Sequence, residues 1–173
     1  HPRTTITLLK QQLAEMNSLF TTVVHHVQSD PQNVPLLHSF ESKKLMPVGD
    51  KLTYLQSTFY PDDVKLTDMV GYGVMCGDSV YRSDALYVDY CSVYCTFLDI
   101  YAHIHALQSN YTTASRYINY AITLMVSSGM YPIMDVVIGR ERVKLGGVLL
   151  SAGNKKDCGV QVKCALEILI PVV

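Results

Sequence analysis

The sequence predicts an all-α domain of about six to seven helices, built as a helical bundle or a short helical-repeat domain. Hydrophobic residues make up 49% of the chain and charged residues only 17%, against a typical charged share of about 25%. The N-terminal segment has the apolar spacing of one helix face, and residues 83–107 are apolar on almost every side. We therefore expect residues 83–107 to form a buried central helix.

The length of 173 residues fits one domain, so we expect a single helical domain over residues 1–173. Because the chain begins at His1 without a methionine, we also expect a fragment of a larger protein. The net charge of −1 favours neither nucleic acid nor an anionic membrane as a direct partner. No run of 18 apolar residues predicts a membrane span.

The five cysteines are an odd number scattered along a chain that is long enough to build its own core. Reduced, buried thiols are therefore expected rather than a disulfide framework. This use of cysteine favours a cytoplasmic or nuclear location.

The first predicted helix covers about Thr4 to Gln28. Its apolar residues alternate spacings of four and three, which places them on one helix face: Leu9, Leu13, Met16, Phe20, Val23 and Val27. Asp30-Pro31 is expected to end this helix. The apolar face needs a partner helix, and packing within the chain is the simpler expectation.

Residues 30–80 are the least regular part of the sequence. Four prolines interrupt residues 30–63, where short helices are predicted at 36–45 and 50–59. Three glycines weaken any helix prediction for residues 64–80.

The central helix is predicted to begin after Ser83, which can cap its first turn. Three further helices are predicted at about 112–128, 133–151 and 157–170, with Thr112 as a cap and Gly129 and Gly153 near helix ends. Gly146-Gly147 lies inside the third of these four helices. Since glycine weakens a helix, we expect another helix to approach closely there.

Residues 98–168 resemble the tetratricopeptide repeat, a helix-turn-helix unit of about 34 residues. Tyr101-Ala102 and Leu145-Gly146 match its large-small pair, and Ala114, Ala121 and Ala165 match its small positions in the second helix. Cys158 departs from that pattern, and Ala121 and Ala165 are 44 residues apart. The resemblance implies that the first helices of two units bind a partner segment through Asp99, His103, Arg140 and Lys144.

One alternative use of the central helix is a metal site. Cys91, Cys95, Asp99 and His103 follow one another at four-residue steps and are all metal-ligand types. However, one straight helix cannot place four ligands around one ion. We therefore expect the cysteines to fill the core and the other two to face a polar seam, with no metal or cofactor bound.

Tyrosines are concentrated between Tyr81 and Tyr131, and basic residues between Arg140 and Lys163. We expect the tyrosines to surround the central helix with their hydroxyls reaching the surface, although a partner-binding surface is the other interpretation. The basic stretch is expected to be a solvated helix face, and it is where an acidic partner segment or a phosphate would dock first.

No hydrolase, metalloprotease or phosphate-loop motif is present. The leading hypothesis is therefore a non-enzymatic protein-interaction or assembly domain, whose partner is another protein or a second copy of the chain. One alternative is a compact regulatory bundle that binds a partner helix in a groove, similar in plan to apoptosis regulators. A metal-dependent enzyme using Cys91 to His103 is the third hypothesis.

Overall fold

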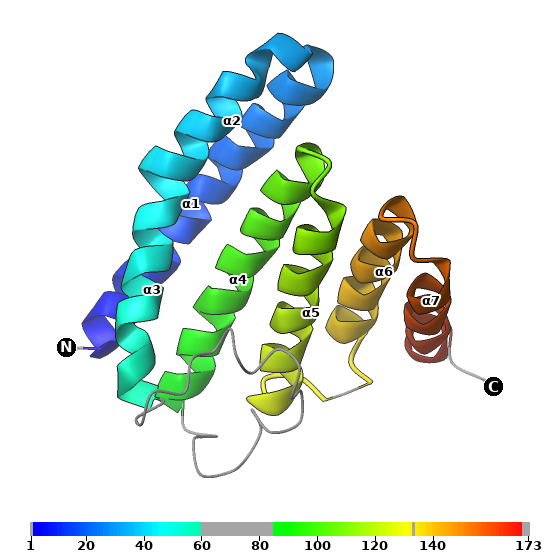
Figure 1. Ribbon diagram of the computed structural model, residues 1–173. Helices are drawn as coiled ribbons and strands as arrows, with labels where there is room; N and C mark the ends of the chain where they lie inside the picture. The colour runs from blue at the N-terminus through cyan, green and yellow to red at the C-terminus, as the bar shows by residue number, and fades with distance from the viewer. Residues whose placement is uncertain (1, 60–84, 133, 171–173) are drawn as a thin grey trace. The chain divides into compact units, whose positions relative to one another are not determined.

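The computed structural model describes residues 2–59, 85–132 and 134–170 (Figure 1). It divides into two compact units, residues 1–63 and 64–173, which are described separately below. The segment 64–80 and the predicted cap Ser83 lie outside the described residues.

The predicted all-α class is confirmed, because every regular element of the described residues is helical. The first unit contains α1 (Pro2–Ser29), a 3₁₀ turn (Pro31–Asn33), α2 (Val34–Phe40), a π-helical turn (Glu41–Leu45) and α3 (Met46–Phe59). The second contains α4 (Ala85–Leu107), α5 (Tyr111–Ser127), α6 (Val136–Ser151) and α7 (Lys155–Leu169).

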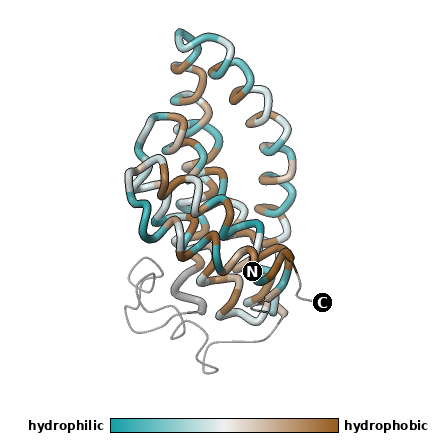
Figure 2. Tube along the Cα trace, turned by 90° about the vertical axis from the view of Figure 1, so that its right-hand side faces the viewer, coloured by the Kyte–Doolittle hydropathy of each residue, from teal (hydrophilic) through white to brown (hydrophobic). Residues whose placement is uncertain are grey.

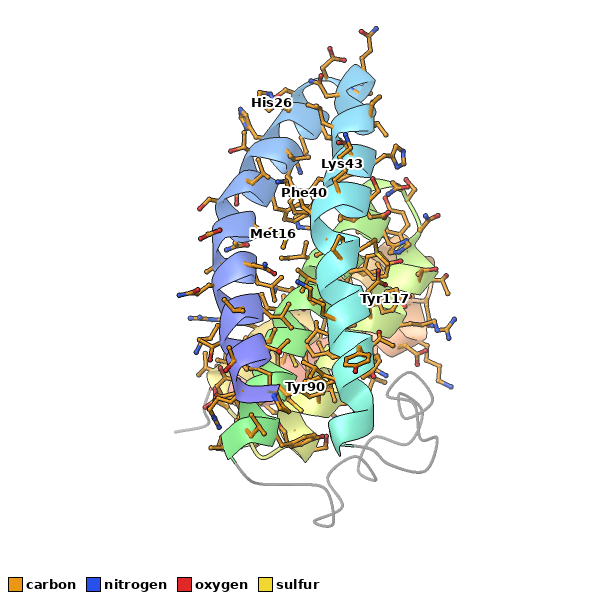
Figure 3. All side chains as sticks on the ribbon, turned by 90° about the vertical axis from the view of Figure 1, so that its left-hand side faces the viewer. Met16, His26, Phe40, Lys43, Tyr90 and Tyr117 are labelled. Atoms are coloured by element: carbon orange, nitrogen blue, oxygen red, sulfur yellow. The ribbon has the colours of Figure 1, made fainter. Side chains whose placement is uncertain are left out.

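In the first unit, α1 buries the predicted apolar face, including Leu9, Leu13 and Phe20. The helix contacts both α2 and α3, and the rings of Phe20 and Phe40 stack with centroids 5.2 Å apart. Figure 3 shows Met16 and Phe40 in the seam between these helices. The expected partner of the α1 face therefore lies within the same unit.

The two short helices predicted at 36–45 and 50–59 are in fact one continuous helical rod from Val34 to Phe59. Pro47 cannot donate a backbone hydrogen bond, and its ring would clash with the carbonyl one turn earlier. The π turn precedes this proline, with the Met46 N–H donating to the Glu41 carbonyl five residues back. The extra residue in that turn lets the helix continue past the proline.

In the second unit, α4 to α7 follow one another as neighbouring helices, with α5 packed between α4 and α6 and α7 packed on α6 (Figure 1). Most positions of α4 from Tyr87 to Ile104 are buried, as predicted for the central helix. Small residues sit where helices meet, because Ala102, Ala121 and Ala165 are almost fully buried.

The ends of α5 and α6 differ from the predicted ones. Asn110, not Thr112, precedes α5. The α6 helix begins at Val136 because the Asp135 carboxylate accepts a hydrogen bond from the Val137 N–H at 2.9 Å. Gly129 and Gly153 follow α5 and α6 with φ of 73° and 83°, a left-handed conformation that suits glycine after a helix.

The close helix approach expected at Gly146-Gly147 is confirmed for Gly146 only. A Cβ added at Gly146 would lie 3.3 Å from Cγ2 of Val162 in α7, whereas one at Gly147 would meet nothing within 4 Å. The closest approach is at Gly139, where an added Cβ would lie 3.0 Å from atoms of Ile168 and Leu169.

These distances predict opposite effects for two glycine substitutions. Gly159→Ala in α7 meets nothing within 4 Å, so improved helix propensity should raise the free energy of unfolding by about 0.5–1 kcal/mol. Gly139→Ala gains the same propensity but crowds α7, at a cost of about 1–3 kcal/mol. Urea unfolding followed by circular dichroism measures both variants, and a Gly139→Ala protein as stable as Gly159→Ala would contradict the close packing.

Candidate functional site

A cavity of about 410 Å³ opens between α4, α5 and α6. Its wall is mostly apolar, with a few polar groups that converge from the three helices. The lining residues are Asp99, Ala102, His103, Ala106, Tyr111, Ile118, Lys144, Gly147, Val148 and Ser151.

The cavity brings together three of the four residues that the sequence suggested for partner binding. Asp99 and His103 enter from consecutive turns of α4, and Lys144 enters from α6. Arg140 lies one turn before Lys144 and is exposed, but it does not line this cavity.

Lys144 contacts one carboxyl group on its own helix, α6, and one on α4. Its ammonium lies 2.8 Å from Oε1 of Glu141 and 3.7 Å from Oδ2 of Asp99. The Glu141 side chain is only 6% exposed, whereas that of Lys144 is 56% exposed. A buried carboxylate without a counter-charge is costly, so the Lys144 ammonium stabilises the carboxylate that α6 carries into the interior.

Burial and the neighbouring Glu141 raise the pKa of Asp99 from 3.8 to about 8. Desolvation is the largest cause, the charge of Glu141 and a hydrogen bond to it come next, and Lys144 opposes them. Two carboxyl groups in one partly desolvated site cannot both ionise easily. Asp99 therefore carries a proton through most of the neutral pH range.

The cation and the imidazole respond to the same surroundings. Burial lowers the pKa of Lys144, but Asp99 and Glu141 outweigh it, so the pKa is raised overall and Lys144 remains a cation. Desolvation against the cavity wall and the charge of Lys144 lower the pKa of His103. A neutral imidazole can both donate and accept a hydrogen bond at the cavity mouth.

Glu141 is the member of this cluster that the sequence analysis missed. It stands between two arginines, in a stretch that we expected to be a solvated face. However, Ile138, Glu141 and Leu145 follow one another at helical spacings of three and four, and all three are buried. The position of Glu141 on the same helix side as these two apolar residues indicated, in the sequence alone, that it faces the interior.

The four-residue stripe on α4 does not converge on one point. The Cys95 thiol donates to the Ala121 carbonyl in α5 at 3.4 Å, whereas Asp99 pairs with Lys144 in α6. Within the described residues, no group of three or more His, Cys, Asp or Glu side chains could hold a metal ion. Burial, followed by the charges of Cys91 and Asp99, raises the pKa of Cys95, so this thiol is a poor nucleophile.

The tyrosines of α4 and α5 pack against each other inside the unit. The ring centroids of Tyr94 and Tyr120 are 5.8 Å apart, and those of Tyr101 and Tyr117 are 4.9 Å apart. Tyr87, Tyr90 and Tyr120 are almost fully buried. The tyrosines thus pack on and around the central helix, but the expectation that their hydroxyls reach the surface is wrong for these three residues.

The raised pKa of Asp99 predicts how stability changes with pH. Folding favours the protonated carboxyl, so its stabilising effect is complete below pH 3.8 and is lost as pH rises to about 8. The lowered pKa of His103 changes stability with pH only below its ordinary value of 6.5. Between pH 6.5 and 8.5 the wild-type chain should therefore lose stability as pH rises, by no more than about 1.4 kcal/mol per pH unit.

Asp99→Asn should remove this loss, because the amide cannot ionise and can still donate to Glu141. Urea unfolding at pH 6.5 and at pH 8.5 measures the difference. Asp50→Asn, which changes an exposed residue of α3, is the matched control and should keep the wild-type slope. An Asp99→Asn protein with the wild-type slope would contradict the assignment.

No helix in the described part of the chain combines the length and the apolar character needed to cross a membrane. Comparison with protein-family models, with curated proteins and with solved structures found no match for this chain.

Proposed function

We propose that this chain is a non-enzymatic protein-interaction domain that binds a segment of another protein in the cavity between α4, α5 and α6. The observation that carries the proposal is the cavity itself. An apolar wall with a few convergent polar groups is the usual form of a binding pocket, and Asp99, His103 and Lys144 stand together in this one.

The wall and the rim suggest complementary tasks in binding. Ala102, Ala106, Ile118 and Val148 provide an apolar surface for one anchoring side chain of the partner. His103 and Lys144 provide hydrogen-bonding groups that can fix the direction of the bound segment. Binding of this kind requires no covalent step.

The repeat resemblance remains part of this proposal. In this interpretation α4–α5 and α6–α7 are two copies of one helix pair, and the first helix of each copy contributes to the cavity. Ala102 and Gly146, like Ala121 and Ala165, stand 44 residues apart and are buried. The free thiols of Cys91, Cys95, Cys158 and Cys164 fit the cytoplasmic or nuclear location that we also propose.

Filling the cavity tests this function. Gly147 lines the cavity, and a Cβ added there meets nothing within 4 Å, so Gly147→Leu should occupy the cavity while preserving the helix. Peptides selected from a random 12-residue phage library on the wild-type chain should bind Gly147→Leu at least about tenfold more weakly, a loss of about 1.4 kcal/mol. Fluorescence anisotropy with the selected peptides measures this change.

The control is Gly159→Leu in α7, which also meets nothing within 4 Å and does not line the cavity. This variant should bind the selected peptides like the wild type. If library selection yields no specific peptide, or if Gly147→Leu binds every selected peptide normally, the proposed function is wrong.

A further inference from the structure

The outer side of α6 carries an exposed apolar stripe that the cavity does not use. Val136, Val143 and Leu150 are spaced seven residues apart, which places them on one side of the helix. Their exposed fractions are 47%, 49% and 53%. Isolated exposed apolar residues are ordinary, but a continuous stripe marks a surface for interaction.

A second stripe on α7 borders the first. Val162 and Leu166 stand one turn apart on α7, and Ile170 follows directly after the helix end, with exposed fractions of 40%, 49% and 63%. Val162 lies against Gly146, and on the surface of α6 Gly146 is located between Val143 and Leu150. The two stripes therefore form one surface, here called the α6–α7 face (Figure 2 views the molecule from this side).

In the preceding helix pair, α4–α5, the residues equivalent to the α6–α7 face are covered by another helix. The residues that stand 44 positions before Val143, Leu150 and Val162 are Asp99, Ala106 and Ile118, respectively. These three residues lie against α6 around the cavity. Ile118 is 5% exposed, whereas its counterpart Val162 is 40% exposed. The α6–α7 face thus presents to solvent the surface that α6 covers on α4–α5.

The charges beside this face are mainly basic. Arg140 lies between Val136 and Val143 on α6, and Lys163 lies one turn before Leu166 on α7. Lys155 stands seven residues before Val162 and so shares its side of α7. Among the acidic residues of these two helices, Glu167 stands one turn after Lys163 and Asp157 pairs with Asn154 at the start of α7, whereas Glu141 is buried and pairs with Lys144.

We propose that the α6–α7 face binds an amphipathic helix of another protein, with acidic residues on both flanks of its apolar side. The apolar stripes bind the apolar side of that helix, and Arg140, Lys155 and Lys163 bind its carboxylates. This second surface goes beyond the cavity function proposed above. A second copy of this chain fits less well, because contact between two α6–α7 faces would bring two copies of the same basic rim together.

Two synthetic 18-residue peptides test the proposal. Both have the same leucine face at helical spacing, and one has glutamate on its flanks where the other has lysine. Each is added to the full 173-residue chain carrying ¹³C-labelled valine and leucine methyl groups. The glutamate peptide should shift the NMR signals of Val143, Leu150, Val162 and Leu166, and should bind at least about tenfold more tightly than the lysine peptide.

Matched variants locate the binding surface. Leu166→Glu should abolish binding of the glutamate peptide, and Arg140→Glu combined with Lys163→Glu should reverse the preference between the two peptides. Leu8→Glu changes an equally exposed leucine of α1 and should bind like the wild type. Circular dichroism melting shows whether each variant is folded, and Val143→Glu replaces Leu166→Glu if the latter is not.

Several results would overturn the inference. Equal binding of the two peptides, methyl shifts confined to other helices, or no binding would each do so. A wild-type dimer that Leu166→Glu dissociates, measured by light scattering, would assign the face to a second copy instead. Ala106→Leu, which fills the same cavity from α4, should leave binding of the glutamate peptide unchanged, so failure of the cavity function and failure of this inference are separate results.

Discussion

The burial of Glu141 and the contact of Lys144 with Asp99 on α4 fix how α6 is rotated about its own axis. Glu141 is a buried carboxylate, and burying it without a nearby cation would be costly. Lys144, one turn later, supplies that cation and also reaches Asp99 on α4. This rotation determines which α6 residues line the cavity, which meet α7 and which face solvent.

The three sides of α6 therefore have separate roles. Lys144, Gly147 and Val148 face the cavity, Gly139 and Gly146 receive α7, and Val136, Val143 and Leu150 are exposed. A rotation of α6 by one residue, about 100°, would bring the buried residues next to Glu141 out toward solvent. It would also replace a glycine by a larger side chain in the contact with α7. The glycines and the buried charge thus specify the same orientation by independent means.

Much of the helix arrangement was predictable from the sequence, because burial follows a simple period in α1 and is almost continuous along α4. Leu9, Leu13 and Phe20 recur at spacings that leave a single interpretation, and the segment from Tyr87 to Ile104 is too apolar for any exposed helix. The passage through Pro47 was not predictable in the same way. Proline alone predicts a helix end, and only the π turn before it allows one continuous rod.

The candidate site was predicted in part for a comparable reason. Asp99, His103 and Lys144 share the correct sides of their helices, but residue spacing within a helix says little about the distance between two helices. Arg140 and Lys144 are one turn apart, yet only Lys144 lines the cavity. Glu141 was missed because its flanking arginines suggested a solvated face, although its register with Ile138 and Leu145 indicated burial.

The protonation of Asp99 also decides what kind of partner the cavity suits. With its pKa raised to about 8, Asp99 is mostly neutral at pH 7, whereas Lys144 remains a cation. His103 is neutral at the same pH because its pKa is lowered. The cavity thus combines an apolar wall with neutral hydrogen-bonding groups and one ammonium, that of Lys144, which favours an apolar anchor that also makes hydrogen bonds. The rim of the α6–α7 face instead carries several cations, and α6 contributes different ionisable residues to these two surfaces.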